Sequence, residues 1–440
     1  MTDISDATEI LRDWKGDSYV FGKGVLNRVG GLAKRFGSRT IVLVSEKASW
    51  IDEPLKIISA SLRENGVSYD ATLGARPNCP REDLYRIALH VKTNRPDSII
   101  AFGGGSTIDA GKAASVLATY TPSEVSNVLG VDWDLACTID PYFGTGIVSR
   151  LKQTTGKDVL PVIAVQTAAS SGAHLTKYSN ITDPLVGQKK LIVDDAIVPK
   201  VSLFDYGMTI GAPASLTVDG GLDGIAHCWE VFMGATGKDY YEKMRRITLV
   251  STRLITKYLK LAKENPKNAE ARTALGLATD LGGYAIMIGG TSGAHLGSFS
   301  LVDVLTHGRA CAILNPYYTV LFSPNIQDQL RTIAPTLREA GYLRGDLSKL
   351  EGRKLGEAVA EGMINLLRDL GVPATLREAS ATREHLDRML SAAKDPQLKM
   401  KLLNMPVPLN PDKGDIEGYM KPVLEASFTG EIKHIRTVGG

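Results

Sequence analysis

The chain has 440 residues and a formal net charge of +3, with 51 Lys and Arg residues against 48 Asp and Glu residues. This length allows two domains of ordinary size, each with its own core. The charges are spread along the chain without a basic block, which argues against a nucleic-acid partner or an anionic membrane surface. We therefore expect a protein that acts on small molecules.

The amino-terminal residues MTDISDATE are polar and acidic, whereas a signal peptide would be basic and then apolar. No apolar run approaches the roughly 20 residues that cross a bilayer. The four cysteines are far apart and form no Cys-x-x-Cys pair, so we interpret them as reduced thiols. These features predict a cytoplasmic protein with no membrane partner.

Along the first half, short apolar strands alternate with helical patterns, which is typical of a mostly parallel sheet covered by helices on both faces. Strands are predicted at residues 40–44, 97–102 and 161–165. Ligands of such folds bind beyond the carboxyl ends of the strands. We therefore expect residues 1–211 to form an α/β domain that binds a dinucleotide at that edge.

A glycine-rich loop, GGGSTIDAGK at residues 103–112, follows the second predicted strand. Glycines let the backbone approach a ligand, and the amides that begin the next helix point at an anion. The loop matches neither Gly-x-Gly-x-x-Gly nor the Gly-Lys-Ser/Thr of a P-loop. Two interpretations stay open: a pyrophosphate site, and a tight turn that binds nothing.

After about residue 212 the strand signals fade. The segments 240–262, 268–287, 354–370 and 383–393 have helical periodicity and polar flanks. Residues 212–440 are therefore predicted to form an all-helical domain. Because no linker separates the halves, we expect a tight cleft between the domains, which is a favoured place for ligands.

Asp223 and His227 lie four residues apart, so a helix would present both on one face. An isolated pair of this kind is more often an ordinary polar pair than a metal site. His295 and His307 follow, however, and the chain has only seven histidines. A carboxylate and three imidazoles suit Fe(II) or Zn(II), and we predict a metal site at these four residues.

Four motifs together resemble the iron-containing (group III) alcohol dehydrogenase family: residues 103–112, residues 167–174, residues 221–230, and His307-Gly308. The resemblance runs from about residue 21 to about residue 425. It implies a fold like that of dehydroquinate synthase, in which a Rossmann-like α/β cofactor domain precedes an all-helical metal-binding domain. It also implies oxidation of alcohols or reduction of aldehydes with NAD or NADP, and we expect a homodimer or a larger homo-oligomer.

The resemblance implies roles for single residues of the cofactor domain. The pyrophosphate would be held by Gly103, Gly104, Gly105 and Ser106, with Asp109 ordering the loop. Three further residues correspond to cofactor neighbours, although each has a simpler interpretation as a capping or surface residue: Thr167, Ser171 and Lys190. Glu46 favours NAD over NADP, because a carboxylate binds ribose hydroxyls and repels a 2′-phosphate; a solvated loop glutamate is the alternative.

Three departures from the family leave alternatives open. His295 and His307 are 12 residues apart, whereas the family has ligand histidines 14 apart with another histidine between them. Either His295 is the third ligand in a shortened loop, which we favour, or it is the intermediate, substrate-facing histidine and a ligand is lost. His174 replaces a glutamate, and either lines the cleft or is satisfied inside the cofactor domain. Residues 120–158 form a longer segment than expected, which is either a lid over the cleft or else a surface elaboration or subunit contact.

The mechanism expected from these parts is hydride transfer between an alcohol carbon and nicotinamide, with the metal polarising the substrate oxygen. Two alternatives belong to other classes. The first is a carbon–oxygen lyase acting on a sugar phosphate, which we expect to have a glutamate among its metal ligands. The second is a degenerate protein that binds the cofactor without catalysis.

Overall fold

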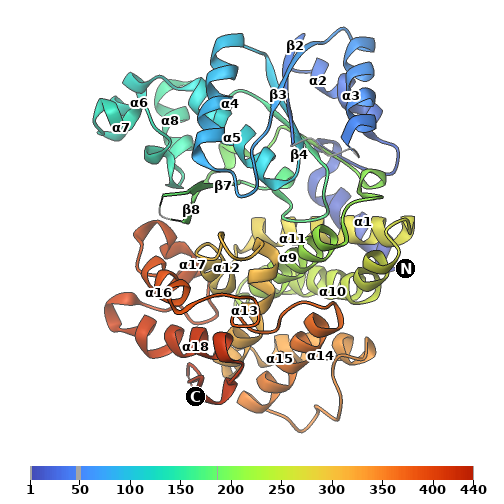
Figure 1. Ribbon diagram of the computed structural model, residues 1–440, viewed down its shortest axis with the longest axis vertical. Helices are drawn as coiled ribbons and strands as arrows, with labels where there is room; N and C mark the ends of the chain where they lie inside the picture. The colour runs from blue at the N-terminus through green and yellow to red at the C-terminus, as the bar shows by residue number, and fades with distance from the viewer. Residues whose placement is uncertain (1, 46–50, 186, 440) are drawn as a thin grey trace. The chain divides into compact units, whose positions relative to one another are not determined.

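The computed structural model describes residues 2–45, 51–185 and 187–439. The chain forms two compact units, one of Arg12–Ala212 and one of Met1–Leu11 with Pro213–Gly440 (Figure 1). The predicted fold class is confirmed, since the first unit is a parallel α/β unit and the second is helical.

The amino terminus differs from the predicted division at residue 211. The first helix, α1 (Asp3–Lys15), begins in the helical unit, where its apolar face is buried through Ala7, Ile10 and Leu11. Asp6 forms an ion pair with Arg246 of α10 (Tyr241–Glu264). These contacts join residues far apart in the sequence, so no local pattern indicates them.

The unit of Arg12–Ala212, which we call the cofactor unit after the role expected for it, contains a six-stranded sheet in which every neighbouring pair is parallel. In spatial order its strands are β1 (Tyr19–Gly22), β9 (Val201–Asp205), β6 (Val162–Gln166), β4 (Ser98–Gly103), β2 (Arg39–Val44) and β3 (Ser68–Leu73). The three strands predicted from the sequence are β2, β4 and β6. The chain runs outward from β2 to β3 and then returns to β4 on the other side of β2, so the strand order reverses between β2 and β4. The carboxyl ends at such a reversal are the usual ligand site of open α/β sheets.

Alternate residues of the central strands face opposite layers of helices, as a pleated strand requires. Ile99 and Ala101 pack with α4 (Arg81–Asn94) and α5 (Gly105–Thr119). Ile100 and Phe102 pack in a second core with α2 (Val29–Lys34) and α3 (Asp52–Glu64). Burial on both faces explains why β4 is apolar along its whole length.

The longer segment at residues 120–158, for which the sequence predicted no helix or strand, is folded into secondary structure. It folds into α6 (Pro122–Leu129), α7 (Trp133–Ala136) and α8 (Ile147–Thr155), with the short strand β5 (Gly144–Thr145) beside β8 (Gln188–Val193). A capping box between Thr121 and Glu124 begins α6. Tyr142 and Phe143 are buried in the core that contains Ile99 and Ala101, whereas Trp133 is exposed. The segment is therefore a helical extension of the core.

Between Pro213 and residue 439 the structure contains helices and no strand. The principal helices are α9 (Ala214–Met233), α10, α11 (Ala269–Ile288), α12 (Gly293–Ser298), α13 (His307–Phe322), α14 (Gln327–Glu339), α15 (Gly352–Asp369), α16 (Arg383–Ala392), α17 (Lys399–Leu403) and α18 (Lys421–Thr429). The four predicted helices are α10, α11, α15 and α16. Within the described ranges, no helix combines the length and the apolar character needed to cross a membrane.

Helix α9 lies at the centre of the helical unit, and nearly all of its side chains are buried. Glycines let its backbone touch the neighbouring helix α11. A Cβ atom added to Gly282 would lie 2.6 Å from the Gly224 carbonyl oxygen, closer than two non-bonded atoms can approach. This tight packing fixes the position of α9, which carries Asp223 and His227.

Candidate functional site

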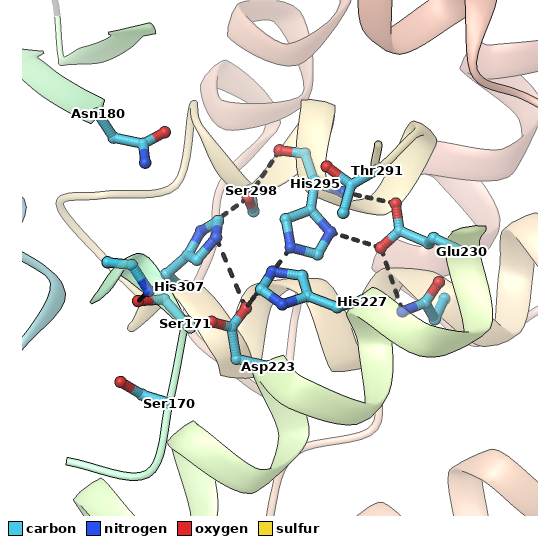
Figure 2. A network of polar contacts seen from close by, with 12 residues as sticks. Ser170, Ser171, Asn180, Asp223, His227, Glu230, Thr291, His295, Ser298 and His307 are labelled. Atoms are coloured by element: carbon cyan, nitrogen blue, oxygen red, sulfur yellow. Dashed lines mark hydrogen bonds and ion pairs between the residues drawn. The ribbon is translucent and has the colours of Figure 1, made fainter. Parts of the chain in front are cut away.

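The four residues predicted to bind metal lie together in the helical unit (Figure 2). Asp223 and His227 are one turn apart on α9, His295 is on the short helix α12, and His307 is the first residue of α13. From Asp223 Oδ1, the Nε2 atom of His227 is 3.7 Å away, that of His295 3.5 Å and that of His307 3.7 Å. Three imidazoles thus converge on one carboxylate oxygen, and we call these four residues the metal cluster.

The donor chemistry of the metal cluster fits a divalent cation. Asp223 Oδ1 and His295 Nε2 are buried and have no hydrogen-bond partner in the described part of the chain. Burial lowers the pKa of His227 to about 4, so its imidazole is neutral near pH 7 and keeps a lone pair for ligation. Burial alone would raise the pKa of Asp223, but the neighbouring histidines hold it well below its usual range. One anionic oxygen and imidazole nitrogens that have released their protons are suitable ligands for a first-row metal.

Glu230 fixes the orientation of His295. Its Oε1 atom lies 2.6 Å from His295 Nδ1, and its Oε2 atom accepts a hydrogen bond of 2.8 Å from the Ser292 backbone amide. A carboxylate on Nδ1 keeps the proton on that atom and leaves the Nε2 lone pair facing Asp223. This geometry supports His295 as a third ligand in a shortened loop over His295 as the intermediate histidine.

Ser298 and Gly308 hold His307 in place. The Ser298 hydroxyl donates to the His295 carbonyl and lies 3.0 Å from His307 Nδ1, where it can accept the ring proton. A Cβ atom added to Gly308 would lie 2.0 Å from the Asp219 carbonyl oxygen and 2.9 Å from Asp223 Cβ. Only a glycine lets the first turn of α13 pack this closely against α9 beside Asp223.

Two residues near the metal cluster were not singled out from the sequence. Glu230 is the last residue of the motif at residues 221–230 and lies three residues after His227 on the same helix. Cys311 lies four residues after His307, the same spacing that drew attention to Asp223 and His227. The ligand atoms of Cys311, Asp223, His295 and His307 all lie within 4.8 Å of one another. Periodicity could have indicated both residues, but not that their helices meet.

In the cofactor unit, the glycine loop lies at the carboxyl end of β4, where the strand order reverses. Gly103 ends the strand, Gly104 caps α5 and Gly105 begins it. Nothing lies within 4 Å of a Cβ atom added to Gly104, and α5 has no acidic residue in its first turn. Gly105 and Ser106, the first residues of this 15-residue helix, directly follow this open position. An anion such as a pyrophosphate suits that position.

Asp109 and Lys112 join helix α5, which follows the glycine loop, to residues 173–180. Asp109 Oδ2 accepts hydrogen bonds of 3.1 Å from the backbone and side-chain nitrogens of Asn180 in β7 (Tyr178–Asp183). Lys112, which is fully buried, donates from Nζ to the carbonyl oxygens of Ala173, Thr176 and Tyr178. These bonds hold the start of α5 in a fixed position, consistent with the ordering role expected for Asp109.

Thr167 and Ser171 also lie beside the loop. The Thr167 amide donates to the Gly103 carbonyl oxygen. The Ser171 hydroxyl oxygen is 2.8 Å from where a Cβ atom of Gly105 would be, so Gly105 makes room for Ser171. The structure thus brings two of the expected cofactor neighbours to the loop.

Lys190 and His174 have other partners, and Glu46 lies outside the described residues. The Lys190 Nζ atom is 3.7 Å from Asp140 Oδ1, in contact with the helical extension. His174 is fully buried, with Nε2 3.2 Å from the Tyr19 hydroxyl. The geometry therefore favours His174 as a histidine satisfied within the cofactor unit.

Comparison with known proteins agrees with this architecture. Residues 17–206 match the family Iron-containing alcohol dehydrogenase, and residues 217–413 match the Fe-containing alcohol dehydrogenase family, C-terminal. Long-chain-alcohol dehydrogenase 1 of Geobacillus thermodenitrificans is 24% identical over 417 residues, which cover 93% of this chain and 95% of that protein.

Two solved structures share the fold. The archaeal Red Sea brine pool alcohol dehydrogenase ADH/D1 has a TM-score of 0.78 and 22% identity, and the match covers 94% of this chain and 97% of that one. Sulfoacetaldehyde reductase from Bifidobacterium kashiwanohense, in complex with NAD+, has a TM-score of 0.70 and 23% identity, with 95% and 98% covered. The predicted reaction class is confirmed, and the chain belongs to the iron-containing alcohol dehydrogenase family.

Proposed function

We propose that this protein transfers a hydride between small alcohols and NAD, and that Asp223, His227, His295 and His307 hold the divalent metal required for the reaction. The observation that carries the proposal is the convergence of three imidazole Nε2 atoms on one buried carboxylate oxygen. Fe(II) is the first candidate and Zn(II) the alternative.

In this proposal each unit binds one reactant. The glycine loop of Gly103, Gly104, Gly105 and Ser106 binds the pyrophosphate of NAD through backbone amides at the start of α5. The metal cluster binds the alcohol, and a bound divalent cation supplies Lewis-acid polarisation of the alcohol oxygen. Glu230 and Ser298 orient His295 and His307 before substrate arrives, so no reorganisation of these imidazoles is needed.

The glycine loop suits the pyrophosphate of NAD and of NADP alike, so the choice of NAD rests on a structural relative. The sulfoacetaldehyde reductase that shares this fold was solved with NAD+. NADP is the alternative. Glu46 is the residue whose carboxylate is expected to repel the 2′-phosphate of NADP, and it lies outside the described residues. Comparing turnover with the two cofactors decides between them.

The lyase alternative is less well supported. It calls for a glutamate among the metal ligands, whereas the glutamate beside the metal cluster, Glu230, bonds His295 Nδ1 on the side away from Asp223. Both family models that match the chain are also those of alcohol dehydrogenases and not of lyases.

The test is a turnover assay on protein loaded with Fe(II) or Zn(II). Primary alcohols, diols and aldehydes are supplied with NAD or NADP, and nicotinamide absorbance is followed. We expect turnover with at least one substrate, and its loss together with the bound metal in His227→Ala. His434→Ala, which changes an exposed histidine, is the matched control and should keep both. Absence of turnover and of cofactor binding would refute the proposal, and turnover independent of bound metal would refute the role of the cluster.

A further inference from the structure

The metal cluster overlaps with a second set of four candidate ligands, and this set contains a thiol. Asp223, His295, His307 and Cys311 each place one ligand atom within 4.8 Å of the other three. Cys311 is fully buried on α13, one turn after His307, so the helix directs both side chains to the same side. The thiol is therefore a neighbour of the atoms expected to surround the cation.

The surroundings of Cys311 differ from those of an ordinary core cysteine. A buried free cysteine commonly behaves as a small apolar side chain, and Cys228 on α9 is an example, since it is fully buried and lies outside the set of candidate ligands. Cys311 instead belongs to a set of candidate ligands with Asp223 and His295. Each of these two residues has a buried atom, Oδ1 of Asp223 and Nε2 of His295, without a hydrogen-bond partner in the described residues. Buried polar atoms without partners need an explanation, and a cation shared with the thiol supplies one.

Charge also favours a sulfur ligand. A divalent cation bound by one carboxylate and neutral imidazoles leaves a net charge of +1 in a buried site. A thiolate in addition makes the site neutral, which lowers the cost of removing it from water. The thiol proton is released to solvent when the metal binds, as in other metal–thiolate sites.

We propose that Cys311 is a ligand of the metal centre and binds the cation through its sulfur together with Asp223, His295 and His307. This inference rests on the proposed metal site and extends it. A thiolate among nitrogen and oxygen ligands favours borderline metals such as Zn(II) and Co(II), so the centre would retain these ions more strongly than a site without sulfur.

Cobalt spectroscopy tests the proposal directly. Metal-free protein carrying Cys137→Ser, which removes the exposed thiol, is titrated with Co(II) in the absence of oxygen. A cobalt–thiolate bond produces near-ultraviolet charge-transfer absorption that nitrogen and oxygen ligands do not produce. We expect this absorption to saturate at one equivalent, to be lost in Cys311→Ser and to persist in Cys228→Ser, the matched change of a fully buried cysteine.

Each outcome decides between the two proposals. Cobalt bound at one equivalent without the charge-transfer absorption overturns the role of Cys311 and leaves the metal site standing. No binding at one equivalent overturns the metal site and the sulfur ligand together. If Cys311→Ser does not fold, the cobalt comparison is replaced by X-ray absorption of zinc-loaded Cys228→Ser protein, which retains Cys311. One sulfur at about 2.3 Å from zinc supports the proposal, and a shell of nitrogen and oxygen alone overturns it.

Discussion

Glu230→Gln tests how strongly the metal cluster depends on the residue behind it. In the native protein Oε1 of Glu230 meets His295 Nδ1 at 2.6 Å, and Oε2 accepts from the Ser292 amide at 2.8 Å. Glutamine has one oxygen and one NH2 group, so one of these positions must receive a donor. An NH2 group facing His295 forces its proton onto Nε2, the atom that faces Asp223. An NH2 group facing Ser292 leaves two buried donors against each other.

Both arrangements weaken metal binding more than they weaken the fold. Loss of a partner that orients a ligand histidine lowers metal affinity about 10- to 100-fold, which corresponds to about 1.4–2.8 kcal/mol. The assay is competition for Zn(II) or Fe(II) between the protein and a chromogenic chelator, with urea unfolding of the metal-free protein measured in parallel. We expect the dissociation constant to rise by that factor in a protein that still unfolds cooperatively.

The matched control is Glu270→Gln. Glu270 is a second glutamate of the helical unit that accepts a 2.6 Å hydrogen bond, in this case from the Tyr258 hydroxyl, and it lies outside the metal cluster. Its substitution should leave metal affinity unchanged. Wild-type metal affinity in Glu230→Gln, or an equal loss in Glu270→Gln, would refute the orienting role of Glu230.

Three further predictions concern a close helix contact, a buried lysine and a buried histidine. Gly308→Ala should lower the free energy of unfolding by about 3 kcal/mol in urea titrations and reduce metal content, because the added Cβ atom would lie 2.0 Å from the Asp219 carbonyl oxygen. The control is Gly418→Ala, which should change neither quantity, because nothing lies within 4 Å of a Cβ atom at that position. Lys112→Met should cost about 3 kcal/mol or more, since three buried carbonyls lose their donor, whereas Lys56→Met at an exposed ion pair should cost almost nothing. In metal-free protein the pKa of His227 is about 4 against 6.5 in the unfolded chain. Between these two pH values the unfolded state therefore binds more protons than the folded state, so the free energy of unfolding falls as the pH drops from about 6.5 to about 4. In urea titrations across this range, His227→Asn should make that fall less steep. An unchanged slope would contradict the neutral, buried state of His227.

The fold and half of the metal cluster could be predicted because they depend on local patterns. Strand β4 is apolar along its length, and a glycine loop follows it, so the strand, its carboxyl end and the next helix are all visible in the sequence. Asp223 and His227 are related by one helical turn, which no tertiary contact needs to supply. His295 and His307 were joined to them through their donor chemistry and the small number of histidines in the chain, but their convergence on Asp223 depends on how α12 and α13 pack on α9.

What the sequence did not indicate depends on contacts between distant segments. The apolar residues of 120–158 were visible, yet only their packing on the core makes that segment a set of short helices and not a loop. Cys311 is instructive because its spacing from His307 is as regular as that of His227 from Asp223. Asp223 and His227 indicate a metal site because carboxylate and imidazole are expected together there, whereas Cys311, in a chain without Cys-x-x-Cys, was interpreted only as a reduced thiol. Gly308 lets α13 approach the backbone of α9, and that approach brings the first two turns of α13 to Asp223. The same glycine that brings His307 to the metal cluster therefore also brings Cys311 to it. On a helix that carries one metal ligand, a side chain one turn further along the same face is thus a candidate ligand as well.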